Sequence, residues 1–524
     1  MPRYSLPPRA IALLLALVAA LLLFRLADLP LVGPDEPRYA RVAVEMHRAG
    51  EWVRPTLQGR PWLEKPALYY WLAGAAYAAL GETEGAARLP SVLAGIVLVG
   101  LTVLVGARLY GPAAGWHAGF ALGTSVLFFV YGRAASMDML LAAGVTAAIG
   151  LAGLRLLGLA GRFAMMGAWA CAGLATLAKG PLGVLLPALV IGGYVVATRH
   201  WRALRRVLSP AGLLAFLAVA GPWYVLIWRD QGQAFLDVFL LDHNLLRFTS
   251  TIHRHPGPPW YYLPLLAGGL FPWSALVLPG LARFAPRRSR ADLFVLLWLV
   301  LPLLFFSAAG SKLPGYILPC LPPLAVQIGR AAAALTDGER VFPRGTGLRA
   351  VAAVTLVLSG LIGAVPYVLL RQGVPQWRLT LPMAAWAVLV ALAFSYRVGR
   401  DAAGALRLLR VGAAGFLLLL ALGAPPIIAA RESGASLFRP AAGREVLAWR
   451  AWRSAWMAGY FYNDGQVREV ETLEEVVAAA RHAPVLVLSG PREREELARV
   501  RGLRSVVLAR GPRDHALIQV DGVR

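Results

Sequence analysis

Charge is scarce in this sequence, and lysine and cysteine are scarcer still. Only 15% of the 524 residues are charged while 58% are apolar, roughly half the charge density of an average soluble domain. Water is therefore not the main solvent of this chain. The two cysteines, Cys171 and Cys320, each stand among apolar residues. This excludes a disulfide framework and a CxxC metal site and leaves packing as their expected role.

Several functional motifs are also absent. A P-loop needs Gly-Lys followed by Ser or Thr, and no lysine here follows a glycine, which excludes ATP-driven transport through this chain. There is no Asp-x-Asp pair of the kind that holds a metal-bound nucleotide sugar. The formal charge of +24 would suggest nucleic acid as a partner in a soluble protein. Here the arginines cluster in short links between apolar runs, which is typical of membrane topology signals and predicts a lipid bilayer as partner, with no nucleic acid.

Apolar runs long enough to cross about 30 Å of hydrocarbon recur through most of the sequence. The first run, Ile11 to Leu23, follows two arginines as in a signal peptide, but no small-residue cleavage motif comes after it, so we expect a retained helix. About thirteen transmembrane helices are expected, near residues 10–28, 88–107, 113–131, 138–158, 163–178, 181–198, 209–228, 260–282, 292–309, 315–334, 350–370, 379–396 and 408–429.

The orientation follows from the arginine-rich links. The links at 199–206, 283–290 and 397–410 fall on the same side as the N-terminal arginines, and the positive-inside rule makes that side cytoplasmic. An odd number of spans then places the C-terminus outside the cytoplasm.

The predicted fold class is therefore an all-α polytopic membrane protein with a small extracytoplasmic α/β C-terminal domain. Residues 1–430 form the transmembrane domain, with outer interfacial helices within 34–65, and residues 431–524 form the soluble domain. In the soluble domain, helix-like and strand-like segments alternate. The helix-like segments are Leu473–Arg481 and Arg492–Val500, and the strand-like segments are Val485–Leu488, Ser505–Leu508 and Ala516–Val520.

All but three of the 52 basic residues are arginine, and the three lysines share one side of the membrane. Lys65, Lys179 and Lys312 all fall at the outer edge in the predicted topology. Snorkelling side chains would explain any one of them. Because a lysine ammonium is a point charge that approaches a phosphate oxygen from many directions, the shared position indicates phosphate binding instead.

Carboxylates gather on the same side, and two of them begin predicted helices. Asp35 precedes a helix expected to end at Gly50 and to lie along the membrane surface through the stripe Tyr39, Val42, Ala43 and Met46. A structural interpretation makes Asp35 a helix N-cap. Asp138, at the start of the fourth span, would on the structural interpretation only complement the helix dipole.

A later outer loop joins histidines and aromatic residues. The aromatics of Trp260-Tyr261-Tyr262 suit an interface belt. His253 and His255, with Glu64, could bind a divalent metal such as zinc, although no HExxH spacing supports such a site.

Seven ordered motifs resemble the bacterial aminoarabinose lipid A transferase family, which belongs to the wider group that includes protein O-mannosyltransferases. They extend over about 290 residues. The motifs are Gly33-Pro-Asp35-Glu36-Pro-Arg38-Tyr39-Ala, Trp62-Leu-Glu64-Lys65-Pro66-Ala-Leu-Tyr69-Tyr70-Trp71, Ser136-Met-Asp138-Met, Ala178-Lys179-Gly-Pro-Leu, His243-Asn-Leu-Leu-Arg247-Phe, Trp260-Tyr-Tyr-Leu-Pro and Ser311-Lys312-Leu-Pro-Gly-Tyr316-Ile-Leu-Pro.

The resemblance implies a GT-C-type fold of thirteen spans in a bacterial cytoplasmic (inner) membrane. It also implies two interfacial helices in the first outer loop, a periplasmic C-terminal domain and a polyprenyl-phosphate sugar donor. It makes Asp35 the catalytic residue, Asp138 a second important aspartate, and Glu64 with a loop histidine the metal site; we choose His255 over His253 because Pro256 follows it. It also implies phosphate contacts from Lys65 and Arg247, and we expect the donor and its lipid phosphate to be bound in addition by Arg38, Tyr39, Lys179, Lys312 and Tyr316.

The implied reaction is transfer of the sugar to an extracytoplasmic acceptor, which could be lipid A, another glycan or a protein hydroxyl. Asp35 would remove the proton of the acceptor as it attacks the anomeric carbon, and the basic residues would stabilise the departing phosphate. Direct displacement predicts inversion, while a retaining route would need a second carboxylate such as Asp138.

A transporter or flippase for a lipid-linked phosphate is the main alternative. Such proteins place charges near the midplane on interrupted helices, whereas the middle of these spans is nearly free of charge. A purely structural scaffold would leave the outward gathering of charges unexplained.

Overall fold

The computed structural model describes residues 7–239, 257–282, 289–338 and 346–522, and they form two compact units. The first unit comprises residues 1–24, 63–69 and 90–421, and the second comprises residues 25–62, 70–89 and 422–524. Each unit thus combines segments that are far apart in the sequence.

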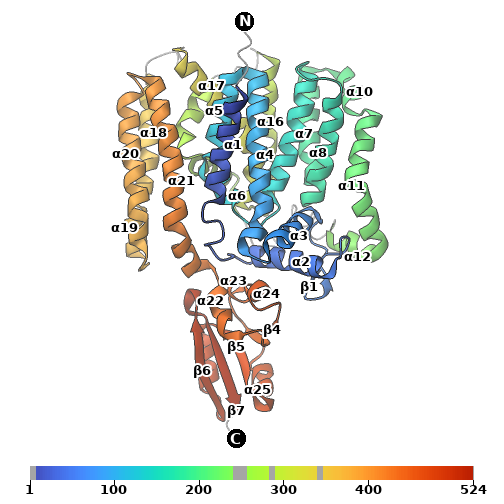
Figure 1. Cartoon of the computed structure of the whole chain (residues 1–524), viewed down its shortest axis with the longest axis vertical. Coiled ribbons are helices and arrows are strands. Elements are labelled where there is room, and N and C mark those ends of the chain that lie inside the picture. Colours follow the sequence, from blue (N-terminus) through green and yellow to red (C-terminus); the bar gives the residue numbers. More distant parts are fainter. Residues whose placement is uncertain (1–6, 240–256, 283–288, 339–345, 523–524) are drawn as a thin grey trace. The chain divides into compact units, whose positions relative to one another are not determined.

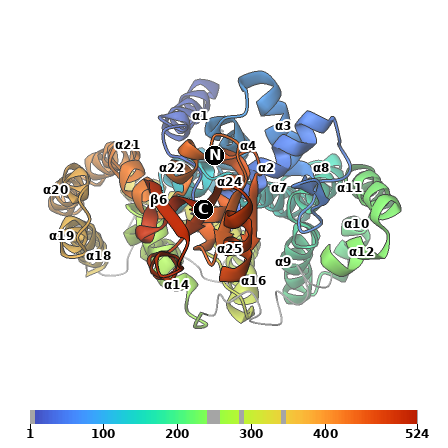
Figure 2. The ribbon, with the colours of Figure 1, turned by 90° about the horizontal axis from the view of Figure 1, so that it is seen from below.

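The first unit is built from apolar helices. Helix α7 packs side by side with α8, and α8 with α11 (Figure 1). In Figure 2, α18, α19 and α20 lie together in a group. The helices with their bounds are α1 (Pro8–Leu23), α4 (Glu84–Tyr110, whose first turn belongs to the second unit), α5 (Pro112–Gly123), α6 (Val126–Gly132), α7 (Asp138–Leu156), α8 (Phe163–Lys179), α9 (Leu182–Thr198), η1 (Trp201–Ala203), α10 (Leu204–Val207), α11 (Pro210–Gln231), α12 (Gln233–Phe235), α14 (Tyr262–Gly269), η3 (Trp273–Leu276), α15 (Val277–Ala282), α16 (Arg290–Ala308), η4 (Pro314–Cys320), α17 (Leu321–Thr336), α18 (Thr346–Gly363), α19 (Val365–Arg371), η5 (Trp377–Thr380), α20 (Leu381–Arg397) and α21 (Ala402–Glu432, which continues into the second unit).

These helices coincide with the predicted spans. Within the described residues, eight helices are long and apolar enough to cross a membrane, and ten spans result if each of two bent helix pairs counts as one. The three shorter apolar helices α1, α8 and α9 fall on the other predicted ranges. A helix satisfies all its backbone polar groups internally, which is why apolar runs of this length fold as helices in lipid.

The two bends occur where the backbone is broken and its polar groups find other partners. Helices α5 and α6 meet at 62°, and α14 and the helix beginning at Trp273 meet at 112°. At the first break the Thr124 hydroxyl donates to the carbonyl of Phe120 at 2.7 Å, and the Trp273 indole donates to the Thr124 hydroxyl at 2.9 Å. A hydrogen bond therefore joins the two breaks. Irregular backbone is tolerated in a membrane protein when it is buried within protein in this way.

The second unit combines the first long loop with the C-terminal residues. Its elements are α2 (Asp35–Ala49), β1 (Thr56–Leu57), β2 (Arg60–Pro61), α3 (Leu68–Leu80, whose first two residues belong to the first unit), α22 (Ala435–Phe438), η6 (Arg439–Ala441), β3 (Val446–Trp449), α23 (Arg453–Met457), α24 (Gly459–Tyr462), β4 (Val467–Val470), α25 (Leu473–His482), β5 (Val485–Ser489), α26 (Pro491–Ala498), β6 (Leu503–Arg510), η7 (Pro512–Asp514) and β7 (Ala516–Gly522).

The five-stranded sheet has the order β4-β3-β5-β7-β6, with β3 parallel to β4 and β5, and β7 antiparallel to β5 and β6. Its buried face packs Trp449, Val487 and Ile518 against Val476 and Ala480 of α25. Helix α25 begins with a capping box between Thr472 and Glu475, a common N-terminal signature.

The loop between the first two predicted spans differs in part from the prediction. Helix α2 ends at Gly50 in a left-handed conformation, as the sequence predicts. Within 34–65 it is followed by the β1–β2 hairpin instead of a second helix, and the next helix, α3, begins at Leu68. Gln58 and Gly59 both have positive φ, which suits the two-residue turn of a hairpin.

The stripe on α2 also has a different role from the one expected. Its side chains, which were expected to contact the membrane, are 0% to 8% exposed and pack within protein. An apolar stripe cannot by itself tell a lipid surface from a protein core, because both are apolar.

Candidate functional site

In the first unit, three residues predicted from the sequence come together from three elements. Asp138 is the first residue of α7, Lys179 is the last of α8, and Tyr316 lies in η4. The Lys179 ammonium donates a hydrogen bond to Asp138 Oδ1, and it lies 4.9 Å from the centroid of the Tyr316 ring. The side chains of Lys179 and Asp138 are only 13% and 18% exposed. A carboxylate and an aromatic face therefore hold a poorly hydrated cation at this point.

Gly315, which the sequence reasoning missed as a functional candidate, permits this arrangement. A Cβ at Gly315 would lie 2.8 Å from Asp138 Cγ and 2.8 Å from the ring of Tyr131. The available signal was the Leu-Pro-Gly sequence beside Lys312, since a glycine in such a place often marks a close approach of backbone.

The other two lysines are buried in the same unit. Lys65 and Lys312 are each 8% exposed. The Lys312 ammonium donates to the carbonyl of Ala309 at 2.7 Å. A snorkelling lysine keeps its charged end in water, so this burial favours a role inside the protein for both.

In the second unit, Asp35 is the first residue of α2 but does not cap it. The N-cap position belongs to Pro34, and no side chain caps the helix. The Arg38 guanidinium instead donates to Asp35 Oδ1 and, through Nε, to the carbonyl of Pro34 at 3.0 Å. The Arg38 side chain is 9% exposed while that of Asp35 is 50% exposed. The carboxylate is thus oriented by a buried arginine and remains open to an approaching molecule.

Arg38 is itself held by aromatic rings. Its guanidinium carbon lies 5.3 Å from the centroid of Trp62 and 5.9 Å from that of Tyr39. Guanidinium groups stack favourably on aromatic faces. Two of the predicted donor-binding residues, Arg38 and Tyr39, therefore orient the candidate base in the structure.

A buried ion pair beside Asp35 was missed by the sequence reasoning. Arg88, only 1% exposed, donates to the Glu36 carboxylate and to the carbonyls of Leu26, Leu29 and Pro30. Glu36 also accepts from the backbone N–H of Val32 at 2.9 Å. The signal was an arginine immediately before a long apolar run, because a buried guanidinium must be paired.

Part of the predicted site lies outside the described residues. This holds for Arg247 and for both candidate metal ligands His253 and His255. Within the described ranges, no three His, Cys, Asp or Glu side chains form a group that could hold a metal ion. Glu64, half-buried, offers a carboxylate oxygen of the kind zinc accepts, but a single ligand does not define a site.

The cysteines are consistent with packing. Both are free thiols, Cys320 buried and Cys171 partly buried.

Comparison with known proteins supports an enzyme class. The apolar helices indicate a multi-pass membrane protein. The charged pairs at their ends indicate a polar functional site there. The family described as dolichyl-phosphate-mannose-protein mannosyltransferase matches residues 64–228. The fold is that of the crystal structure of ArnT from Cupriavidus metallidurans in the apo state, with a TM-score of 0.77, 25% identity and 97% of both chains covered. A second ArnT structure, bound to undecaprenyl phosphate, gives a TM-score of 0.76 at 23% identity.

Sequence relatives identify the family more closely than the family model does. An undecaprenyl phosphate-alpha-4-amino-4-deoxy-L-arabinose arabinosyl transferase of Pseudomonas aeruginosa is 35% identical over 380 residues, which are 68% of this chain and 66% of the relative. A protein of the same description from Pseudomonas fluorescens is 32% identical over 70% of this chain and 67% of its own length. The chain thus spans about two thirds of the length of the curated relatives it matches. It belongs to this aminoarabinose transferase family of membrane glycosyltransferases.

Proposed function

We propose that this chain transfers a sugar from a polyprenyl phosphate carrier, with undecaprenyl phosphate the first candidate, to an acceptor outside the cytoplasm. Lipid A is the first acceptor to test, before other glycans and protein hydroxyls. One observation carries the proposal. The Lys179 ammonium is paired with Asp138 and covered by Tyr316 at the end of an apolar helix. A lipid phosphate at the edge of the hydrocarbon would need such a partly dehydrated cation.

The reaction requires two kinds of group. As the acceptor oxygen forms its bond to the anomeric carbon, the bond from that carbon to the phosphate oxygen breaks, and negative charge grows on the departing carrier phosphate. Lys65, Lys179, Lys312 and Arg247 are the proposed cations that stabilise this charge, in a site where low hydration strengthens each interaction. Tyr316 holds Lys179 through its ring.

The acceptor must also lose a proton, and Asp35 is the proposed base. Its carboxylate is half exposed and is aligned by Arg38, so an acceptor hydroxyl or phosphate could reach it. Attack opposite the leaving phosphate gives inversion at the anomeric carbon. Retention would instead require a carboxylate as nucleophile, with Asp138 the candidate.

The proposal also includes the side of the membrane on which the C-terminus lies and a bound metal ion. We propose that the C-terminus lies outside a bacterial inner membrane, as the arginine pattern and the odd number of predicted spans indicate. A divalent cation held by Glu64 and His255 would supply positive charge near phosphate. Glu64→Ala should then lower the metal content of the purified protein, and unchanged content would remove this site.

The proposed function is tested by incubating the purified protein with a panel of polyprenyl-phosphate sugars and lipid A. Mass spectrometry should detect free carrier phosphate and glycosylated acceptor together. Movement of the intact donor across a vesicle membrane without release of carrier phosphate would identify a flippase and contradict the proposal.

A further inference from the structure

The segment that leads into Asp35 is bonded to residues near the C-terminus of the chain. Leu31 donates its backbone N–H to the Tyr462 hydroxyl at 2.7 Å and accepts at its carbonyl from the Ser433 hydroxyl at 2.9 Å. Two residues on, Gly33 donates its N–H to the carbonyl of Glu432 at 3.3 Å. The Tyr462 hydroxyl in turn donates a hydrogen bond to Glu84 Oε1 at 3.0 Å. Three hydrogen bonds therefore fix the backbone just before the candidate base.

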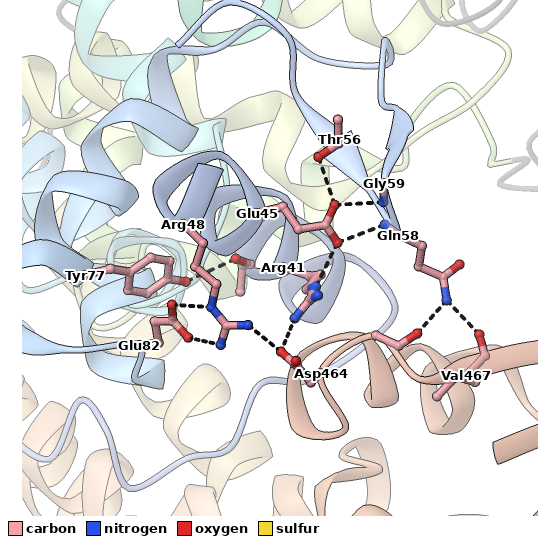
Figure 3. Close-up of polar contacts among 12 residues, drawn as sticks. Arg41, Glu45, Arg48, Thr56, Gln58, Gly59, Tyr77, Glu82, Asp464 and Val467 are labelled. Atoms are coloured by element: carbon pink, nitrogen blue, oxygen red, sulfur yellow. Dashed lines mark hydrogen bonds and ion pairs between the residues drawn. The ribbon is translucent and has the colours of Figure 1, made fainter. Parts of the chain in front are cut away.

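Two arginines of α2 share the carboxylate of Asp464 as a hydrogen-bond acceptor. Arg41 and Arg48 are seven residues apart, two turns of helix, and so project from one face of α2. Both donate to Asp464 Oδ1, at 2.5 and 2.7 Å (Figure 3). Arg48 also donates through Nε and Nη2 to both oxygens of Glu82, at 2.8 and 2.6 Å.

Glu45 links the same face of α2 to the β1–β2 hairpin. Its carboxylate accepts from Arg41 at 2.8 Å, from the Thr56 hydroxyl, and from the backbone N–H groups of Gln58 and Gly59 (Figure 3). Burial raises the pKa of Glu45, but the hydrogen bonds from these donors outweigh it and the pKa lies below its ordinary value. The carboxylate is therefore charged and fully engaged near neutral pH.

The hairpin in turn reaches the C-terminal residues. The Gln58 amide donates to the carbonyls of Gly465 and Val467, each at 2.7 Å. The side chains of Gln58, Arg41 and Arg48 thus all donate to one short segment, residues 464–467.

That segment is a rigid turn. Asp464 has φ of 51° and Gly465 of 78°, so the chain turns here in the left-handed region. The buried side chain of Asn463 donates to the carbonyls of Arg444 and Gln466 at 2.9 and 2.8 Å, and it accepts from the N–H of Gly443. A rigid turn can hold Asp464 in one place against two arginines.

We propose that Asp464 and Tyr462 are positioning residues, through which the C-terminal residues set the orientation of α2 and hence of the Asp35 carboxylate. This inference rests on the proposed function, because it assumes that Asp35 acts as the base. It predicts that the contacts of Tyr462 and Asp464 with residues 31–48 affect turnover, although neither side chain is a reacting group.

Asp464→Ala is the main test, and the chain offers a matched control in Asp514. Asp514 also has a positive φ, 56°, its side chain is 55% exposed against 57% for Asp464, and it also pairs with two arginines, Arg494 and Arg510. Both of those arginines belong to the same C-terminal residues, so Asp514→Ala repeats the backbone strain and the loss of charge without touching α2.

We expect Asp464→Ala to lower kcat for carrier-phosphate release by about 10- to 100-fold, since misplacing a reacting group by about 1 Å has effects of that size. The KM for the donor should change less than twofold. Asp464→Asn, which keeps an acceptor oxygen and tolerates positive φ, should recover part of the rate. Asp514→Ala should keep wild-type kcat while showing the same thermal unfolding temperature as Asp464→Ala. Equal kcat in the two alanine variants, or a raised donor KM with unchanged kcat, would overturn the inference.

A double variant separates this inference from the proposed function. In an Asp35→Asn background the residual rate should be unaffected by Asp464→Ala, because the group being positioned is already disabled. An equal loss in both backgrounds would show that Asp464 does not act through Asp35. Near-normal turnover of Asp35→Asn alone would remove Asp35 as the base, whatever Asp464→Ala does.

Discussion

Asp35 and Asp138 occupy the same position in their helices but have different surroundings. Each is the first residue of a helix, and neither caps it by a side-chain hydrogen bond. Asp138, in the first unit, is 18% exposed and paired with a lysine from another helix, while Asp35, in the second, is 50% exposed and paired with an arginine on its own helix. An aspartate committed to a buried cation suits charge placement, whereas an open and oriented aspartate suits proton transfer.

The largest effect should follow from removing the base. Asp35→Asn is nearly isosteric and cannot accept a proton, so turnover should fall about 10²- to 10⁴-fold while donor binding is kept. Release of carrier phosphate measures turnover, and Asp28→Asn, at another exposed aspartate of the second unit that pairs with an arginine, is the control. If Asp35→Asn retains near-normal turnover, the contrast between the two aspartates fails and Asp138 becomes the residue to test.

Breaking the pair of Lys179 with Asp138 should lower the free energy of unfolding. Lys179→Met leaves the Asp138 carboxylate without its charged donor, at a cost of about 1.5–3 kcal/mol in the free energy of unfolding. Thermal unfolding in detergent measures this. The double variant Lys179→Met with Asp138→Asn should recover part of the loss, because no unpaired charge remains. Additive losses in the double variant would show that the two side chains do not depend on each other.

A conservative change at a buried lysine should weaken donor binding. Lys65→Arg keeps the charge but replaces a compact ammonium by a planar fork, and we expect about tenfold weaker affinity for the donor, equivalent to about 1.4 kcal/mol. Titration with a polyprenyl-phosphate sugar measures the affinity. Arg108→Lys, at a residue that donates to the Leu159 carbonyl, is the reverse exchange and should leave affinity unchanged. Wild-type affinity in Lys65→Arg would indicate that any cation suffices there.

The smallest effect concerns the hydrogen bonds that hold α2. Because the folded-state pKa of Glu45 lies below its ordinary value, its stabilisation is fully present above the unfolded-state pKa and is lost as pH falls through the folded-state value. Glu45→Gln should therefore lower the free energy of unfolding by about 1 kcal/mol at pH 7 and by less below about pH 4.

Thermal unfolding at the two pH values measures this difference. Glu445→Gln is the control, since its pair with Arg468 is more than half exposed and should contribute little at any pH. A pH-independent effect of Glu45→Gln would assign its role to packing rather than charge.

Most of the fold could be predicted from the sequence, because apolar runs of span length have few alternatives to helix. The sequence also predicts strands β5, β6 and β7 from their apolar residues. Strands β3 and β4 were missed since each has four residues, and β4 carries two exposed charged side chains, Arg468 and Glu469, between its valines. Neither strand shows the alternation over several residues that sequence reasoning needs.

The residues of the candidate site could be predicted from the sequence more readily than the contacts between them. The lysines stood out by rarity, but the pairing of Lys179 with Asp138 joins residues 41 apart on different helices, and no local pattern encodes it. The contacts of Asp464 with Arg41 and Arg48 span more than 400 residues. Such pairings depend on tertiary packing, which a single sequence does not display.

The second unit joins residues 25–62 and 70–89 to residues 422–524, and this division has a consequence for biogenesis. When Leu31, Gly33 and Arg41 leave the ribosome, their partners Tyr462, Glu432 and Asp464 have not been made. At a synthesis rate of about 5–20 residues per second, these partners are made on the order of half a minute after α2. Chains cut short by premature termination would therefore lack the hydrogen bonds that join Leu31, Gly33 and Arg41 to the C-terminal residues.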